Sequence, residues 1–137
     1  MSDRYFIDSN IWLYVPIEGE SDKTRIAREI VVVQPIIIST QVINEVTFNL
    51  LKKCHYSEPE IQQFITNISD TYEIKLVTSK TSLKASYFRE KYPLSFWDSL
   101  IVASAIESDC NILYSEDMQH KMIIQDTQII NPFLCEN

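Results

Sequence analysis

Short, strongly apolar runs alternate with longer segments of helical periodicity, and this alternation limits the possible folds more than any other feature. Residues 5–7 and the β-branched residues 36–38 are typical of strands buried on both faces of a sheet. Further runs are residues 74–77, 112–114 and 128–130. Strands separated by helices pair in parallel through right-handed crossovers, with helices on both faces. The sequence therefore predicts a three-layer α/β/α sandwich with a central, mostly parallel sheet.

The segments between these runs carry the periodicity and the end signals of helices. We expect helices over residues 10–15, 23–33, 41–53, 57–72, 78–91 and 94–108, and a short helical turn over residues 117–122. The clearest start signal is Ser57-Glu58-Pro59-Glu60, which matches a capping box. Because the chain has 137 residues and no linker or low-complexity stretch, we expect residues 1–137 to form a single domain.

Charge and glycine content exclude several classes of function. The net charge of −7 argues against a general nucleic-acid-binding protein, which presents a basic surface, and it favours a basic partner. Gly19 is the only glycine, so the glycine-rich loops that hold nucleotide phosphates are impossible here. The sequence contains no apolar run as long as a membrane span and no secretory signal. We therefore expect a cytoplasmic protein that does not associate with membranes.

Acidic residues are predicted to meet at the edge of the sheet where the strands end. Ligands of open parallel sheets bind at this edge. Three of the acids follow different strands, and the fourth lies in the first turn of the apolar helix over residues 94–108. These residues are Asp8, Glu45, Asp117 and Asp98, in that order. Glu116 is a neighbour that could replace or support Asp117.

Each acid also has a purely structural explanation. Asp8, Asp98 and Asp117 suit the N-terminal ends of helices, and a lone helical glutamate such as Glu45 is usually a solvated surface residue. Four carboxylates in one cleft, however, repel one another. Mg²⁺ takes oxygen ligands from carboxylates and from substrate phosphates, and a cation held in this way can activate water for attack on a phosphodiester. Taken together, the acids predict a metal-dependent nuclease site.

Blocks of sequence around these acids resemble PIN-domain proteins, and in particular the VapC-type toxins of bacterial toxin–antitoxin pairs. The blocks are residues 6–10, 41–45, 95–105, 113–120 and 130–133, which follow the family's order over nearly the whole chain. The resemblance implies a Mg²⁺- or Mn²⁺-dependent endoribonuclease that hydrolyses RNA. It also implies a homodimer that is silenced by a small antitoxin. The basic tail of such an antitoxin often reaches into the acidic site, which fits the charge of −7.

The resemblance also implies roles for individual residues. The family's acidic, metal-binding quartet corresponds to Asp8, Glu45, Asp98 and Asp117. Asn10 falls on the polar position two residues after the first acid, and Ser115 falls on the small hydroxyl residue two before the last acid. Lys121 is a departure, because relatives often carry glycine there. We expect it to alter a loop beside the site and to leave the acids intact.

Two other functions fit part of the pattern. A phosphatase of the haloacid-dehalogenase type also has an acid after its first strand, but it needs a second Asp at the position of Asn10. A non-catalytic binding module would use the acids only to cap helices and to bind a basic partner. Adding a metal ion separates these alternatives, because only a metal site responds to it with increased stability.

Two tryptophans flank the acids in the sequence. Trp12 follows Asp8 by four residues, and Trp97 directly precedes Asp98. Stacking on RNA bases is one possible role for them. We predict instead that both tryptophans pack in the core around the acids.

Overall fold

The computed structural model describes residues 2–134, which form a six-stranded sheet. The strands are β1 (Tyr5–Ile7), β2 (Ile36–Ser39), β3 (Glu73–Lys75), β4 (Ile112–Tyr114), β5 (Ile123–Ile124) and β6 (Thr127–Ile130). Their order is β3-β2-β1-β4-β6-β5, and every neighbouring pair is parallel except β5 with β6. Phe6 of β1 lies in register with Ile37 of β2 and Leu113 of β4. The predicted, mostly parallel sheet is confirmed.

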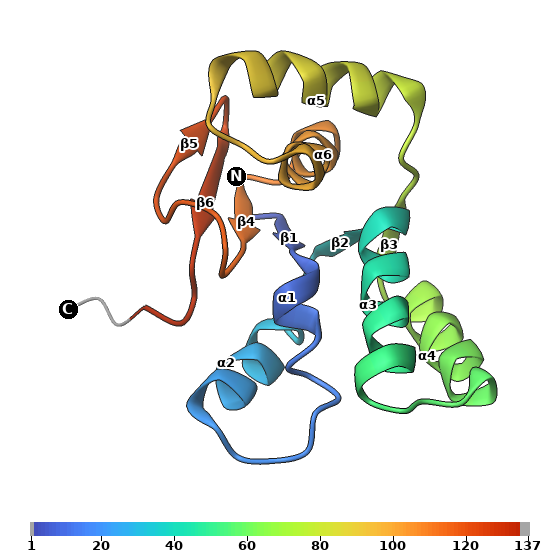
Figure 1. Ribbon diagram of the computed structural model, residues 1–137. Coiled ribbons are helices and arrows are strands. Elements are labelled where there is room, and N and C mark those ends of the chain that lie inside the picture. The colour runs from blue at the N-terminus through green and yellow to red at the C-terminus, as the bar shows by residue number, and fades with distance from the viewer. Residues whose placement is uncertain (1, 135–137) are drawn as a thin grey trace.

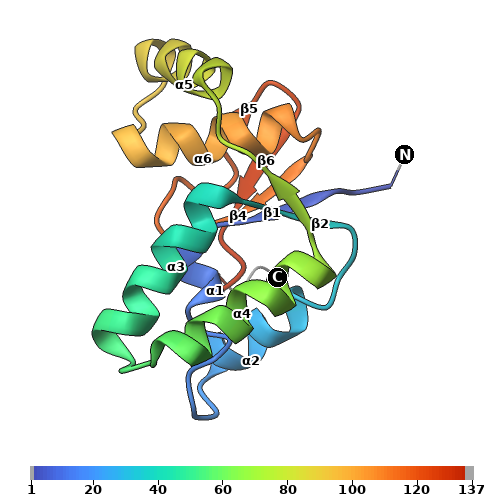
Figure 2. The same cartoon turned by 90° about the vertical axis from the view of Figure 1, so that its right-hand side faces the viewer.

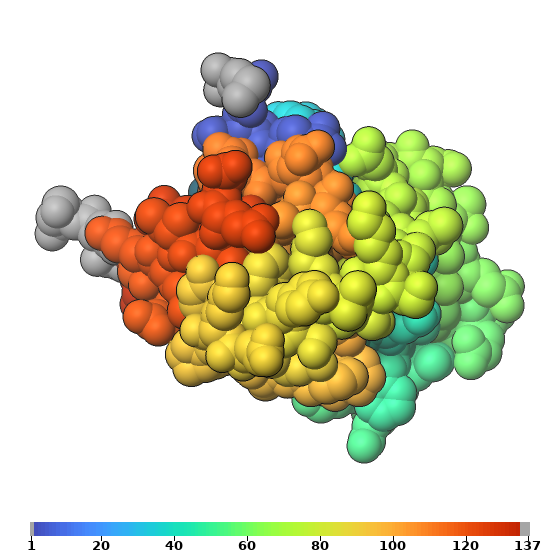
Figure 3. Space-filling model, turned by 90° about the horizontal axis from the view of Figure 1, so that it is seen from above, coloured from blue at the N-terminus to red at the C-terminus, as the bar shows by residue number. Residues whose placement is uncertain are grey.

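Helices cover both faces of this sheet. They are α1 (Ser9–Trp12), α2 (Asp22–Ile30), α3 (Thr40–Lys53), α4 (Glu58–Thr71), α5 (Ser79–Lys91) and α6 (Phe96–Glu107). Helices α5 and α6 lie on one face, and α1 to α4 lie on the other (Figures 1 and 2). Seen from above, α5 forms the outer surface of its face (Figure 3). The predicted three-layer α/β/α sandwich is confirmed.

Side-chain caps set the starts of the helices. The Ser57 hydroxyl accepts a hydrogen bond from the Glu60 amide, and the Glu60 carboxylate accepts one from the Ser57 amide, so the predicted capping box is present. Ser39 caps α3 and Ser95 caps α6 through the same kind of contact with the third residue of the helix. Each cap is worth about 1 kcal/mol. The caps of α3 and α6 fix where the side chains of their first turns lie.

The core is built from β1, β2 and the all-round apolar helix α6. Phe6, Ile7 and Ile38 are fully buried, and so is most of α6 from Ser99 to Ala105. Because α6 is buried from Ser99 to Ala105, it holds its N-terminal turn at the edge where the strands end. No helix among residues 2–134 has the length and apolar character needed to cross a membrane.

Two local predictions were wrong. Residues 117–122 form bends and a turn in place of a helical turn, and Lys121 has a φ of 70°, which a right-handed helix does not allow. Strand β5 was not predicted. It pairs with β6 through a two-residue loop that contains Gln125 with a φ of 52°. Such loops usually carry glycine or asparagine, so the sequence gave no hairpin signal.

Candidate active site

Asp8 is the buried centre of the candidate site. It follows β1, and only 5% of it is exposed. Its Oδ1 accepts a hydrogen bond from the Ser9 amide at 2.7 Å, and its Oδ2 accepts one from the Ser115 hydroxyl at 2.9 Å. Burial raises the pKa of Asp8 to about 6, the two hydrogen bonds act against this shift, and the charges of Asp98 and Glu45 add to it. The donors are neutral, so they offset only part of the cost of the buried charge.

Glu45 reaches the same region from the second turn of α3. The Gln41 amide nitrogen donates to its Oε2 at 3.5 Å, whereas its Oε1 is buried and has no hydrogen-bond partner in the part of the chain that the structure describes. Burial raises the pKa of Glu45, and the charge of Asp98 raises it further. An unpaired, buried carboxylate oxygen is costly, and a cation that reached it would offset that cost.

Asp98 lies in the first turn of α6, where its amide donates to the Ser95 hydroxyl at 3.1 Å. Burial raises the pKa of Asp98, and the charge of Asp117 adds to the shift. Asp98 is therefore coupled to Asp117 and also to the two acids described above. Of the four acids that the sequence singled out, Asp98 is the one whose charge is linked to the pKa of each of the others or is itself influenced by them.

The loop after β4 presents its two acids differently. Asn10 holds Asp117 through a hydrogen bond of 2.9 Å from its amide nitrogen to Oδ2. The Glu116 carboxylate instead accepts hydrogen bonds from Tyr14, at 2.8 Å, and from Lys23. The geometry therefore associates Asp117 with the other acids, and Glu116 with a separate ion pair.

The donor atoms in this region suit a hard divalent cation. They are carboxylate oxygens, including the unpaired Oε1 of Glu45. Within residues 2–134, however, no three acidic, histidine or cysteine side chains are arranged to hold an ion. The acids influence one another's pKa, and an ion shared by three of them requires their carboxylates to move closer together. Asp117 is exposed, and Glu45 and Asp98 are half-buried, whereas Asp8 is buried.

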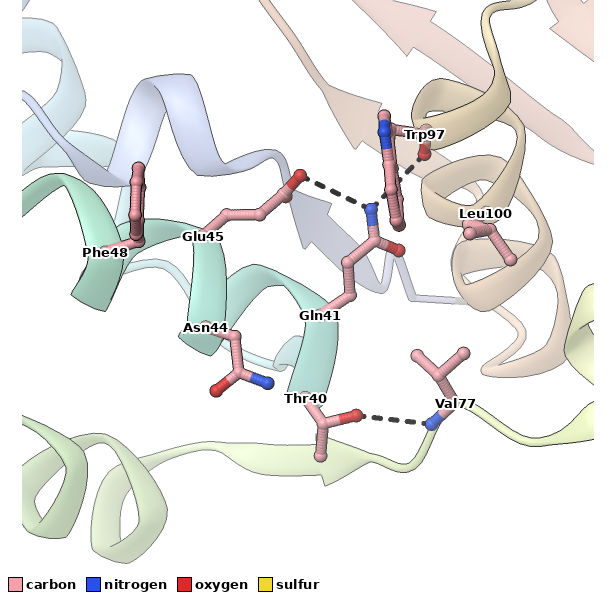
Figure 4. A pocket seen from close by; sticks show the side chains of 8 residues that line it. All are labelled: Thr40, Gln41, Asn44, Glu45, Phe48, Val77, Trp97 and Leu100. Atoms are coloured by element: carbon pink, nitrogen blue, oxygen red, sulfur yellow. Dashed lines mark hydrogen bonds between the residues drawn. The ribbon is translucent and has the colours of Figure 1, made fainter.

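A pocket beside Glu45 was not indicated by the sequence. Its volume is about 660 Å³, and its walls come from α3, α6 and the segment after β3. The lining residues are Thr40, Gln41, Asn44, Glu45, Phe48, Val77, Trp97 and Leu100 (Figure 4). The placement of α3 beside α6 creates this pocket, and no local sequence signal reports that placement.

The prediction for the two tryptophans was right for one of them. Trp12 is 3% exposed, and its indole donates to the Ile7 carbonyl at 3.1 Å, so it packs in the core as expected. Trp97 is 61% exposed, so its predicted core position is wrong. It lies in the first turn of α6, where Ser99 and Leu100 face inward and Trp97 faces out. Because α6 has apolar residues on all its faces, its sequence pattern does not indicate which face is exposed.

Comparison with known proteins identifies a family model that matches the sequence and several solved structures that share the fold. The family model of the PIN domain matches residues 5–123. The structure is similar to a toxin–antitoxin complex from Klebsiella pneumoniae, with a TM-score of 0.72 at 21% identity over 94% of this chain and 98% of that one. It is also similar to the Sarcin-Ricin loop cleaving toxin VapC20 of Mycobacterium tuberculosis, with a TM-score of 0.66 at 17% identity over 80% and 86% of the two chains.

A third similar structure is VapBC2 from Rickettsia felis bound to a promoter DNA fragment, with a TM-score of 0.65 at 19% identity over 92% of this chain and 96% of that one. No match was found among curated proteins. At these identities the structural likenesses establish a shared fold. The family match rests on the sequence itself and spans most of the chain.

Proposed function

Because the chain belongs to the PIN domain family, we propose that it is a metal-dependent endoribonuclease and the toxin of a toxin–antitoxin pair. The observation that carries this proposal is the buried carboxylate of Asp8, whose pKa is raised to about 6 beside Glu45 and Asp98. A folded chain keeps such a cluster of charges at a cost. A bound cation offsets that cost, because the carboxylates then serve as its ligands.

In this proposal Asp8, Glu45 and Asp98 hold Mg²⁺ or Mn²⁺, and Asp117 completes the site or holds a second ion. When bound, the ion supplies positive charge that activates water and offsets the charge developing on the phosphate. Ser115 orients Asp8 through the hydrogen bond of 2.9 Å. Asn10 orients Asp117 in the same manner.

Substitution of the acids tests this function. Asp8→Asn and Asp98→Asn should each reduce cleavage of single-stranded RNA in Mn²⁺ by at least about 100-fold, because each removes a charged ligand at the reacting centre. Asp70→Asn, the same change at an exposed site on α4, should leave cleavage unchanged. Circular dichroism should show that all three variants are folded. Full activity in either site variant contradicts the assignment.

Thermal melting with added Mn²⁺ separates the nuclease from a non-catalytic binding module. An ion that binds only the folded chain stabilises it by about 2.7 kcal/mol at 100 times its dissociation constant. The wild-type protein should therefore melt at a higher temperature as Mn²⁺ is added, and Asp98→Asn should respond much less. Acids that serve only as helix caps would give no response in either protein. A phosphatase would instead hydrolyse a small phosphomonoester.

The proposal includes the partners that the resemblance implies. A basic antitoxin tail is supported by the net charge of −7 and by the cluster of acids. A homodimer is supported by the exposed apolar side chains of Leu76, Leu83 and Tyr87, on α5 and the segment that precedes it. A cytoplasmic location is part of the same proposal.

A further inference from the structure

We propose that the pocket beside Glu45 binds one nucleobase of the RNA, adjacent to the phosphodiester held at the acids. This inference rests on the proposed ribonuclease function and adds a substrate subsite to it. Glu45 belongs to both regions, since it lines the pocket and is coupled to Asp98. A base in the pocket would therefore lie one side chain away from the acidic cluster.

Two exposed aromatic rings line the pocket. Trp97 is 61% exposed and Phe48 is 60% exposed. Phe96 packs edge-to-face against Trp97, with 5.0 Å between ring centroids, and the Arg89 guanidinium lies 4.7 Å from the Phe96 centroid. Phe96 thus packs against Trp97, and the rest of the Trp97 ring remains exposed to solvent, where a base can stack on it. Bases stack on such rings in single-stranded RNA recognition.

The polar groups of the pocket suit the edge of a base. The Gln41 amide nitrogen donates to Glu45 and, at 3.3 Å, to the Trp97 carbonyl. Both partners are acceptors, so the amide orientation is fixed, and Gln41 Oε1 is left buried with no hydrogen-bond partner in the part of the chain described. Figure 4 shows this oxygen on the side of the pocket lined by Leu100 and Val77. A rotation of the Gln41 side chain that turned this buried oxygen into the pocket would let an N–H group of a base satisfy it.

The charge of the pocket favours a base over a phosphate or a basic peptide, and its size is compatible with a base. Among the described residues that line it, Glu45 is the only charged one, and the others are apolar or neutral. A phosphate would be repelled here, and a basic tail would find its charge partners among the acids instead. The volume of about 660 Å³ falls within the range of about 300–1,000 Å³ that is usual for small-ligand sites. A neutral, flat, hydrogen-bonding ring matches this composition.

Tryptophan fluorescence tests the proposal without any cleavage. Trp12 is buried, so Trp97 is the tryptophan whose emission a bound base can reach. In Mn²⁺, the 5′-monophosphates of adenosine, guanosine, cytidine and uridine should be titrated against ribose 5-phosphate, which has the phosphate but no base. We expect saturable quenching by at least one nucleotide and none by ribose 5-phosphate. Equal responses to nucleotide and sugar phosphate, or quenching only by a basic peptide, overturn the proposal.

Variants of the pocket give the second readout. Phe48→Ala should weaken nucleotide binding about tenfold, which corresponds to about 1.4 kcal/mol and lies within the range for one stacked base. In RNA cleavage it should raise KM by a similar factor with little change in kcat. Asn44→Ala, at the polar part of the pocket, should alter the preference among the four bases. Ile123→Ala is the matched control, because Ile123 is also 60% exposed but lies on the edge strand β5.

The outcomes distinguish this inference from the ribonuclease function. If the wild-type protein cleaves RNA and Phe48→Ala has the same KM and base preference, the subsite is wrong and the nuclease assignment stands. If nucleotides quench Trp97 but no RNA is cleaved, the subsite stands and the nuclease assignment is wrong. If Phe48→Ala changes the mass of the protein in sedimentation, a second copy covers the pocket, and the proposal is overturned.

Discussion

At the scale of single residues, Asp8 bears its charge in a position that favours the neutral form. The pKa of Asp8 is about 6 in the folded chain and 3.8 as an ordinary aspartate. Above pH 6 both states are ionised, and the folded state bears a cost of about 3 kcal/mol. As the pH falls from 6 towards 4, the folded state takes up the proton first. In EDTA this group therefore makes the protein more stable as the pH is lowered through this window.

Asp8→Asn should remove that dependence. At pH 7.5 in EDTA the variant should be more stable than the wild-type protein by up to about 3 kcal/mol, because it no longer buries a charge. Near pH 4 the two proteins should converge, since Asp8 is then protonated. Urea unfolding at both pH values measures the difference. A variant that is equally destabilised at both would mean that shape, and not charge, governs this position.

Ser115 provides a second prediction at this scale. Its hydroxyl donates to Asp8 and holds the pKa of that carboxyl below the value that burial alone would give. Ser115→Ala should therefore move the acid limb of the cleavage pH profile to higher pH and cost about 1.5–3 kcal/mol of stability at pH 7.5, as expected for a hydrogen bond to a charged group. Ser104→Ala is the control, because Ser104 is also fully buried and its hydroxyl has no partner among the described residues. Equal pH profiles in the two variants would exclude this role.

At the scale of elements, helix caps connect stability to the site. Ser95 caps α6, and Ser57 caps α4 far from the acids. Replacing either serine by alanine should cost about 1 kcal/mol of unfolding free energy. Only Ser95→Ala should also reduce RNA cleavage, because Asp98 lies in the turn that Ser95 holds. Denaturant melts and cleavage rates of the two variants, measured together, test this; a similar loss of activity in both would point to a general effect of stability.

Among the strands, helices and turns, those with local sequence signals could be predicted. The runs at Tyr5–Ile7 and Ile36–Ser39 and the capping box of α4 are local signals, so β1, β2 and α4 could be predicted. The turn around Lys121 and the hairpin of β5 depend on positive φ values at non-glycine residues, which composition does not reveal. The resemblance had already singled out Lys121, as a position where relatives often carry glycine. Its φ of 70° gives a physical reason, since glycine adopts that conformation without strain.

At the scale of the whole molecule, the parallel order of the sheet makes a site from residues far apart in the chain. Strands β1, β2 and β4 are adjacent and parallel. The segments that carry Asp8, Glu45 and Asp117 therefore begin at the same edge of the sheet, and this shared edge could be anticipated from the alternation of strands and helices. The pocket could not be, because it requires the distance between two helices, and the exposure of Trp97 depends on the rotation of α6 about its axis. Sequence pattern determines neither quantity when a helix is apolar all round.

The exposed apolar side chains of α5 lead to a prediction about how two copies of the chain associate. Leu83 and Tyr87 are one helical turn apart on the outer surface and are more than half exposed. If two copies associate through this surface, Leu83→Glu should place unpaired charges in the interface and lower the mass measured by sedimentation equilibrium from the dimer to the 16.0 kDa monomer. Val32→Glu, at an even more exposed apolar residue just after α2, should leave the dimer intact. A wild-type protein that remains monomeric at micromolar concentration would contradict the expected homodimer, whereas dissociation by Val32→Glu would locate the interface elsewhere.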